Sequence, residues 1–473
     1  MKGIKNMNTK RITMVCALIA CLAIGASGAP ALTYDLKDLG YLPNKKENVS
    51  TAAAINNSGE VAGTSGGAAF RYTKEMEEIG PNPYALSRGF GIDAVGQVVG
   101  DSTFDKGGFI SHAALFSNGS VRDLGTLPGS GEFSRANGIN ALGQVVGFSG
   151  EKFDGEGARA FIMETSGKYL GRMVDLGTLG GQYAQAWGIN DSGFVTGNSQ
   201  TKGALGLVTH AFLWDQRTGM LDLGTLDGDF SYGTFINGNN HVVGYSTIDK
   251  ENDRVHAFLH NGKEMLDLGS LGGASMQSDR SYALGVNADD QVVGYSYLPA
   301  RDPAAGDGPS YAMQQVAFVY SKGLMMNLND MIGEAANEYR LDAATAINDN
   351  GQIVAVAWVN SASAYRAVLL TPRDRGASAA ELDRAGTSIT VNSATYSVTY
   401  SMLTVQVTYA GAPSTTRPII SVYDGASKEL IGTLKTKNGS NYFGSFAWKA
   451  NPQYIWIADN TGQSAAAKVE QTK

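Results

Sequence analysis

The chain has 473 residues, which is enough for two or three domains. It contains 60 glycines and only 17% charged residues, a mixture that indicates many turns and few long amphipathic helices. The formal net charge is −7, and no basic stripe is present that could neutralise phosphates. The composition therefore argues against a nucleic-acid partner.

Residues 1–31 have the features of a secretion signal: a positively charged start, the apolar run 12–25 and a small-residue site at Ala29-Pro30-Ala31. Leu18-Ile19-Ala20-Cys21 also resembles a bacterial lipobox, which would place a lipid-anchored Cys21 at the mature N-terminus. We favour cleavage after Ala31, because apolar residues continue past Cys21. Both routes predict an extracellular or periplasmic protein.

The only two cysteines, Cys16 and Cys21, lie inside this segment. We therefore expect no intramolecular disulfide and no cysteine metal site in the mature chain. No later stretch reaches the roughly 18 apolar residues that a membrane span needs, so we expect no transmembrane segment.

A repeat occupies most of the chain, with the consensus I-N-x-x-G-x-V-V-G. Its units are 37 to 61 residues apart and begin at Ile55, Ile92, Ile139, Ile189, Ile236, Val286 and Ile347. Each unit also has a later apolar run around an Ala, and most end in a D-L-G segment such as Asp267-Leu268-Gly269.

The position four after the first residue of each unit carries only residue types that tolerate a positive φ. These residues are Gly59, Gly96, Gly143, Gly193, Asn240, Asp290 and Gly351. A tight hairpin needs one left-handed residue after a type I turn. We therefore predict a hairpin there, opened by a side-chain hydrogen bond from the Asn that follows the Ile.

Each unit predicts a four-stranded antiparallel sheet, and repeats of about 45 residues with four strands are typical of propeller blades. In the seventh unit, no D-L-G segment follows the third strand Arg366–Leu370, so its fourth strand is missing. An extra D-L-G segment, Tyr34–Gly40, lies at the N-terminus and can supply that strand. The count predicts an all-β protein in which residues 32–372 form a seven-bladed β-propeller closed by the N-terminal strand.

The tripeptides His210-Ala211-Phe212 and His256-Ala257-Phe258, each followed by D-L-G and a hairpin motif, resemble the HAF-repeat family of bacterial extracellular proteins. The resemblance covers roughly residues 33–372, with Arg159 and Arg366 replacing the histidine in two units. It implies secretion and a repeat architecture, and it implies no established activity or catalytic residue.

Residues 373–386 are charged and Ala-rich and predict a linker. Alternating runs with turn signals follow, for example 403–409 and 419–423. This pattern predicts a small β-sandwich, immunoglobulin-like but without cysteines, over residues 387–473.

No catalytic or cofactor fingerprint occurs in the sequence, so we assign no catalytic residue, no metal site and no cofactor. His112, His210 and His256 fall at equivalent places in different units, which favours structural hydrogen bonds with neighbours. The acidic loop residues Asp249, Glu251 and Asp253 lack the spacing of a calcium loop.

The loops between second and third strands vary in length, and function tends to sit on such loops. On that face, the residue four before the repeat start is the candidate ligand-binding position. It is occupied by Arg88, Arg135, Gln185, Tyr232 and Tyr282 in the second to sixth units.

The absence of a catalytic constellation favours a secreted binding or scaffold protein, with a glycan, a small anionic ligand or a cell-surface protein as partner. The alternative is a polysaccharide hydrolase or lyase, because propellers host both classes. A pair of carboxylates about 5–10 Å apart at the channel mouth would favour the hydrolase.

Overall fold

The computed structural model describes residues 33–373, apart from 44, 46, 81–85, 106–109, 118, 152–156, 166–170, 204–205, 273–277 and 300–312. Farther along it describes eight strands between residues 388 and 472. The predicted signal segment and, except for Arg373, the predicted linker lie outside these described residues. The described chain is almost entirely β-structure, with two short 3-10 helices, η1 (Leu328–Met331) and η2 (Gly333–Asn337).

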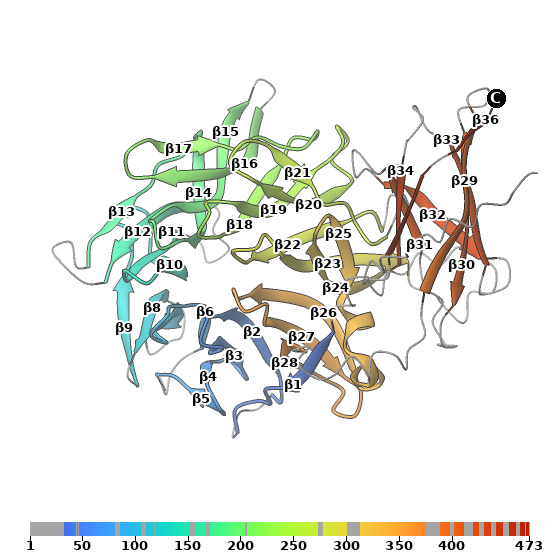
Figure 1. Cartoon of the computed structure of the whole chain (residues 1–473). Helices are drawn as coiled ribbons and strands as arrows, with labels where there is room; N and C mark the ends of the chain where they lie inside the picture. The colour runs from blue at the N-terminus through green and yellow to red at the C-terminus, as the bar shows by residue number, and fades with distance from the viewer. Residues whose placement is uncertain are drawn as a thin grey trace, which may run out of the picture.

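Seven four-stranded antiparallel sheets form a propeller around one centre (Figure 1). The innermost strands are β2 (Ser50–Ile55), β6 (Ser87–Ile92), β10 (Phe133–Ile139), β14 (Gly180–Ile189), β18 (Ser231–Ile236), β22 (Ser281–Val286) and β26 (Tyr339–Ile347). The second strands are β3 (Val61–Ser65), β7 (Val98–Thr103), β11 (Gln144–Gly150), β15 (Val195–Gly203), β19 (Val242–Thr247), β23 (Val292–Pro299) and β27 (Ile353–Val359). We number the blades from one to seven in this order, and the predicted blade count is confirmed.

The outer half of each blade follows the same order. The third strands are β4 (Ala68–Tyr72), β8 (Ser111–Ser117), β12 (Arg159–Glu164), β16 (Gly206–Asp215), β20 (Val255–His260), β24 (Met313–Ser321) and β28 (Ala364–Pro372). The outermost strands are β5 (Met76–Glu78), β9 (Ser120–Gly125), β13 (Met173–Asp175), β17 (Gly219–Asp222), β21 (Met265–Asp267) and β25 (Leu324–Asn327). In blade 7, β1 (Tyr34–Asp38) pairs antiparallel with β28, with Tyr34 opposite Pro372.

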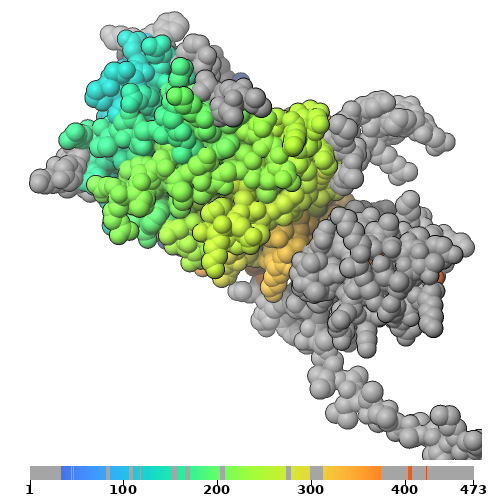
Figure 2. All heavy atoms as spheres, turned by 90° about the horizontal axis from the view of Figure 1, so that it is seen from above, coloured from blue at the N-terminus to red at the C-terminus, as the bar shows by residue number. Residues whose placement is uncertain are grey.

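The third strand supplies the core of each blade and its link to the next blade. In blade 5, Phe258 is fully buried, and the equivalent Phe70, Phe161, Phe212 and Phe318 are too. The amide of the preceding Ala257 donates to Ser281 Oγ of blade 6 at 2.8 Å, and Ser281 Oγ donates to Gly269 O. Ser50, Ser134 and Ser231 make the same two bonds at other junctions, whereas Ser87 accepts from Ala69 N. Five of the seven junctions therefore have a buried serine bridge in addition to apolar contacts. Figure 2 shows the colours following one another in chain order.

Tight turns connect the first two strands of each blade as predicted. The residue expected to be left-handed has a φ between 57° and 80° in all seven blades: Gly59, Gly96, Gly143, Gly193, Asn240, Asp290 and Gly351. The Asn three residues earlier (Asp93 in blade 2) opens the turn through its side chain. For example, Asn237 Oδ1 accepts hydrogen bonds from the amides of Asn239 and His241 at 3.0 Å. The prediction of left-handed backbone is confirmed, and these turns define one face of the propeller, the turn face.

Eight further strands lie in the C-terminal part of the chain. They are β29 (Ser388–Ser397), β30 (Met402–Ala410), β31 (Ile420–Asp424), β32 (Leu430–Thr436), β33 (Asn441–Ala447), β34 (Tyr454–Asp459), β35 (Ser464–Lys468) and β36 (Glu470–Thr472). Their pairing order is β35-β34-β31-β32-β33-β30-β29-β36. All neighbours are antiparallel except β29 and β36, which run parallel.

Candidate functional site

The five predicted site residues hold the same position in five consecutive inner strands, four residues before the strand ends at the turn face. Each faces a residue of the second strand in the same blade. The pairs are Arg88 with Asp101, Arg135 with Phe148, Gln185 with Asn198, Tyr232 with Tyr245 and Tyr282 with Tyr295. We call these ten residues the mouth residues. The structure therefore doubles the predicted set with residues from the second strand.

The backbone at these positions is held by a repeated bulge and a glycine. The pairing of the first two strands slips by one residue just after the mouth position in every blade, as between Gly233 and Phe235 in blade 5. The slip presses the carbonyl of Tyr232 against Gly244, where a Cβ would lie only 1.8 Å from that oxygen. No side chain fits there, which explains the glycine that ends the V-V-G motif in blades 1 to 6.

Two arginines share one carboxylate at the junction of blades 2 and 3. Asp101 is almost fully buried and accepts from Arg88 Nε at 2.9 Å and from Arg135 Nε at 3.3 Å. The Arg135 guanidinium also lies over the rings of Phe90 and Phe148, 4.8 and 5.5 Å from their centroids. Burial lowers the pKa of Arg135, and Asp101 opposes that effect, so the group keeps its charge. Two of these three side chains are cationic, and Asp101 is anionic.

A stack of tyrosines lines the junction of blades 5 and 6. Tyr232 stacks on Tyr245 at 4.9 Å, and Tyr282 stacks on Tyr295 at 4.8 Å. Tyr245 meets Tyr282 edge-on at 4.9 Å, so the two pairs form one continuous group, which Tyr297 extends. Burial raises the pKa values of Tyr245 and Tyr295, so their hydroxyls stay protonated at neutral pH and can donate hydrogen bonds.

Blade 4 separates the arginines from the tyrosines. Trp187 Nε1 donates to Asn198 Oδ1 at 2.6 Å, and the Trp187 ring lies 6.3 Å from that of Phe148. Gln185 faces Asn198 in the register of the same blade. The five predicted residues thus fall into an arginine pair and a tyrosine stack, with Gln185 in the blade between. Their second-strand partners could have been found in the sequence as the residue that follows each V-V-G.

The turn face is closed by a ladder of asparagine side chains that the sequence analysis missed. The buried Asn of each turn donates from Nδ2 to the main-chain carbonyl of the equivalent residue in the next blade. The six bonds, 2.9 to 3.3 Å long, run from Asn56 to Asp93, Asn140 to Asn190, Asn190 to Asn237, Asn237 to Asn287, Asn287 to Asn348 and Asn348 to Asn56. Blade 2 has Asp93, whose carboxylate has no N–H to donate.

The three motif histidines bond to the Asp of the D-L-G segment in their own blade, as predicted. Nδ1 of His112 lies 3.0 Å from Asp123, and Nδ1 of His210 lies 2.9 Å from Asp222. Arg159 takes the same role with Asp175. The predicted hydrogen bonds of the histidines with neighbouring residues are confirmed.

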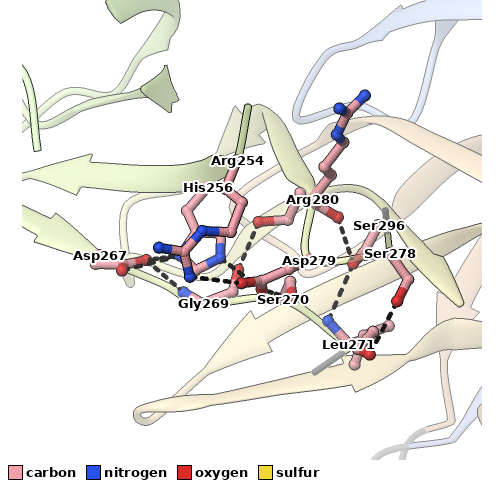
Figure 3. Close-up of polar contacts among 12 residues, drawn as sticks. Arg254, His256, Asp267, Gly269, Ser270, Leu271, Ser278, Asp279, Arg280 and Ser296 are labelled. Carbon is pink, nitrogen blue, oxygen red and sulfur yellow. Dashed lines mark hydrogen bonds and ion pairs between the residues drawn. The ribbon is translucent and has the colours of Figure 1, made fainter. Parts of the chain in front are cut away.

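His256 differs because both of its ring nitrogens face carboxylates (Figure 3). Nδ1 lies 2.8 Å from Asp267 of blade 5, and Nε2 lies 2.8 Å from Asp279, two residues before the inner strand of blade 6 begins at Ser281. Ser270 and Arg254 also donate to Asp279. Burial would lower the pKa of His256, but the two carboxylates outweigh it and raise the pKa to about 9. At neutral pH the imidazolium therefore ties the two blades together.

In the described part of the chain, no group of three or more His, Cys, Asp or Glu side chains is placed to hold a metal ion. In the same residues, no helix is long and apolar enough to cross a bilayer. Asp249 of the acidic loop accepts from Arg254 Nε at 2.8 Å, and its pKa is lowered chiefly by that bond.

Comparison with known proteins gives one family. The model of a family described as "Protein of unknown function (DUF3466)" matches residues 130–416, more than half of the chain. The match runs from just before β10 of blade 3 into the C-terminal strands. No curated protein matches the sequence.

Proposed function

We propose that this protein, which belongs to the DUF3466 family, is a secreted binding or scaffold protein whose ligand sits on the mouth residues. The observation that carries the proposal is the cluster of Arg88, Asp101 and Arg135 on the same rim as the tyrosine stack. We infer an acidic sugar or a similar small anion as the ligand.

The chemistry of the rim fits such a ligand in two ways. Guanidinium groups bind carboxylates through charge-assisted and often bidentate hydrogen bonds. Aromatic rings can stack on the apolar face of a sugar, and tyrosine adds a hydroxyl donor in the same side chain. Arg88 and Arg135 supply the first element, and Tyr232 and Tyr282 supply the second.

The test is calorimetric titration of the mature protein with glucuronic acid and with an oligogalacturonate. Arg135→Ala is the variant of choice, because Asp101 stays paired with Arg88 and the buried carboxylate keeps a partner. Loss of one charged hydrogen bond should weaken binding about tenfold or more. The lost contacts with Phe90 and Phe148 should lower the melting temperature by no more than a few degrees, so the protein stays folded at the temperature of the titration.

The matched control is Arg373→Ala, which removes another arginine–aspartate pair, with Asp35 at 2.7 Å. It should leave the affinity unchanged. Binding of neither probe, or equal affinity in Arg135→Ala and the parent protein, would refute the proposal. Release of reducing ends from the oligogalacturonate by the parent protein would favour the alternative, a hydrolase or lyase.

We also propose export, in keeping with the HAF-repeat resemblance. Mass spectrometry of the protein from the cell envelope and medium distinguishes the two processing routes. A mature chain that begins at Leu32 supports cleavage after Ala31, and a diacylated Cys21 supports lipid anchoring. A full-length cytoplasmic chain contradicts both.

The closing role of the N-terminal strand is a further part of the proposal. Its support is the pairing of β1 with β28 and the hydrogen bond from Leu39 N to Ala367 O at 3.0 Å. Deletion of residues 32–41 should lower the melting temperature and cause association through the unpaired edge of β28. A monomer with unchanged melting temperature would refute it.

For residues 387–473 we propose the β-sandwich. Its support is the antiparallel pairing of most strands and the full burial of Leu403, Val405, Val422 and Ile457. A fragment 387–473 that gives a cooperative unfolding transition would support an independent domain, and one that is unfolded in solution would contradict it.

A further inference from the structure

The turn face carries a cavity of about 640 Å³ at the junction of blades 3 and 4. Its walls come from the blade 4 turn with Ser192 and Phe194, from the outer edge of blade 3 with Glu164, Arg172 and Val174, and from the segment Trp214–Arg217, which spans the end of β16 and the turn after it. This volume is within the ordinary range for small-ligand sites. We call it the blade 3–4 groove.

A second cavity of about 360 Å³ lies at the preceding junction, between blades 2 and 3. Ser117, Ser120, Arg122 and Thr165 contribute polar groups to its wall. Leu142 lines both cavities, so only the blade 3 turn separates them. Two neighbouring sites at successive blades suit a ligand that itself repeats.

The lining of the blade 3–4 groove combines aromatic surface with balanced charge. Trp214 and Phe194 are half-buried, and Leu142 and Val174 are 63% and 46% exposed. Two arginines, Arg172 and Arg217, are matched by two carboxylates, Glu164 and Asp215. Such a wall has no net charge to attract an ion, but it offers donors and acceptors to hydroxyl groups.

We propose that the blade 3–4 groove binds a neutral linear polysaccharide, with a sugar ring stacked on Trp214 and the chain continuing over Leu142 into the neighbouring cavity. The aromatic side chains provide apolar faces for the ring, and the carboxylates and guanidiniums hydrogen-bond its hydroxyls. The site lies on the opposite face from the mouth residues and does not depend on the function proposed for them.

The test is titration of the mature protein with neutral hexasaccharides, namely cellohexaose, maltohexaose, xylohexaose and chitohexaose, followed by calorimetry and tryptophan fluorescence. At least one probe should bind and change the fluorescence. Trp214→Ala should weaken that binding about tenfold or more, the scale of one lost stacking contact. Trp214→Phe should recover much of the affinity, because it keeps an aromatic face.

Controls separate this site from the mouth and from loss of fold. Arg217→Ala changes a side chain that is 87% exposed, so it should weaken binding without lowering the melting temperature. Trp358→Ala, which removes an aromatic residue paired with Tyr365 in blade 7, should not alter affinity, and neither should Arg135→Ala. The proposal is overturned if no hexasaccharide binds, or if Trp214→Ala and Arg217→Ala both bind as the parent does.

Discussion

Replacement of Asp93 by asparagine should complete the ladder on the turn face and stabilise the propeller. Asp93 is 4% exposed and accepts hydrogen bonds from the amides of Val95 and Gln97 and from Gln97 Nε2. In blade 3, Asn140 accepts the same two kinds of amide through Oδ1 and donates to Gln144 Oε1 at 2.8 Å. An asparagine at 93, with the Gln97 amide turned over, can adopt this arrangement and donate to Asn140 O.

The expected gain follows from one new bond and one removed charge. A typical buried hydrogen bond contributes about 0.5–1.5 kcal/mol net. The hydrogen bonds from the amides of Val95 and Gln97 become weaker because their acceptor is no longer charged. This loss is offset, because the fold no longer has to bury a charged carboxylate. We expect a net stabilisation of about 1 kcal/mol, or a rise in melting temperature of roughly 1–2 °C.

The matched variant is Asn140→Asp, which makes the opposite change in the neighbouring blade. It loses the donors to Asn190 O and Gln144 Oε1 and should cost about 1–3 kcal/mol. Both variants are compared with the parent by calorimetry and by urea unfolding. If Asp93→Asn lowers stability as much as Asn140→Asp does, the carboxylate itself is stabilising and the reasoning from the ladder is wrong.

Three other perturbations test the remaining features. The charged His256 should stabilise the fold by about 2–3 kcal/mol, fully below pH 6.5 and no longer once the pH has risen through about 9. The difference in unfolding free energy between the parent protein and His256→Gln should therefore shrink over that range. A constant difference would contradict the pairing. Gly244→Ala should destabilise by roughly 1–3 kcal/mol because its Cβ would meet Tyr232 O, and unchanged urea unfolding would refute this. Gly193→Val should cost roughly 1–2 kcal/mol from its positive φ, whereas Asn240→Gly should be neutral or stabilising, as melting temperatures will show.

The regular parts of the propeller were predictable because each repeats a local chemical requirement. A positive φ at one turn position selects Gly, Asn or Asp, and that choice is visible in every unit of the sequence. The buried Phe of the third strand and the Asn of the turn can also be recognised in the sequence, because each recurs at the same place in most units. Blade number and turn geometry therefore follow from spacing alone.

The contacts between blades were harder to predict, because each joins residues far apart in sequence. The hydrogen bond from Asn348 Nδ2 to Asn56 O joins the two ends of the repeat region. The sequence predicts only a local role for Asn348, which is to open the turn of its own blade. Asp279 looks like an ordinary loop residue until the fold places it 2.8 Å from His256 Nε2. The sequence does not identify Asp101 as a site residue either, although the position that follows V-V-G can be located in every unit.

The mouth residues vary from blade to blade because the fold constrains their backbone and not their side chains. Gly244 contacts the carbonyl oxygen of Tyr232, an atom that every residue type has, so the same contact serves arginine in blades 2 and 3 and glutamine in blade 4. In blade 7, Ala355 replaces the glycine. With the glycine present, the mouth position can change its chemistry without loss of the strand register. If the proposed site is correct, variation at this position would alter the ligand that it binds, while the turn face, held by the asparagine ladder, keeps the blades in place.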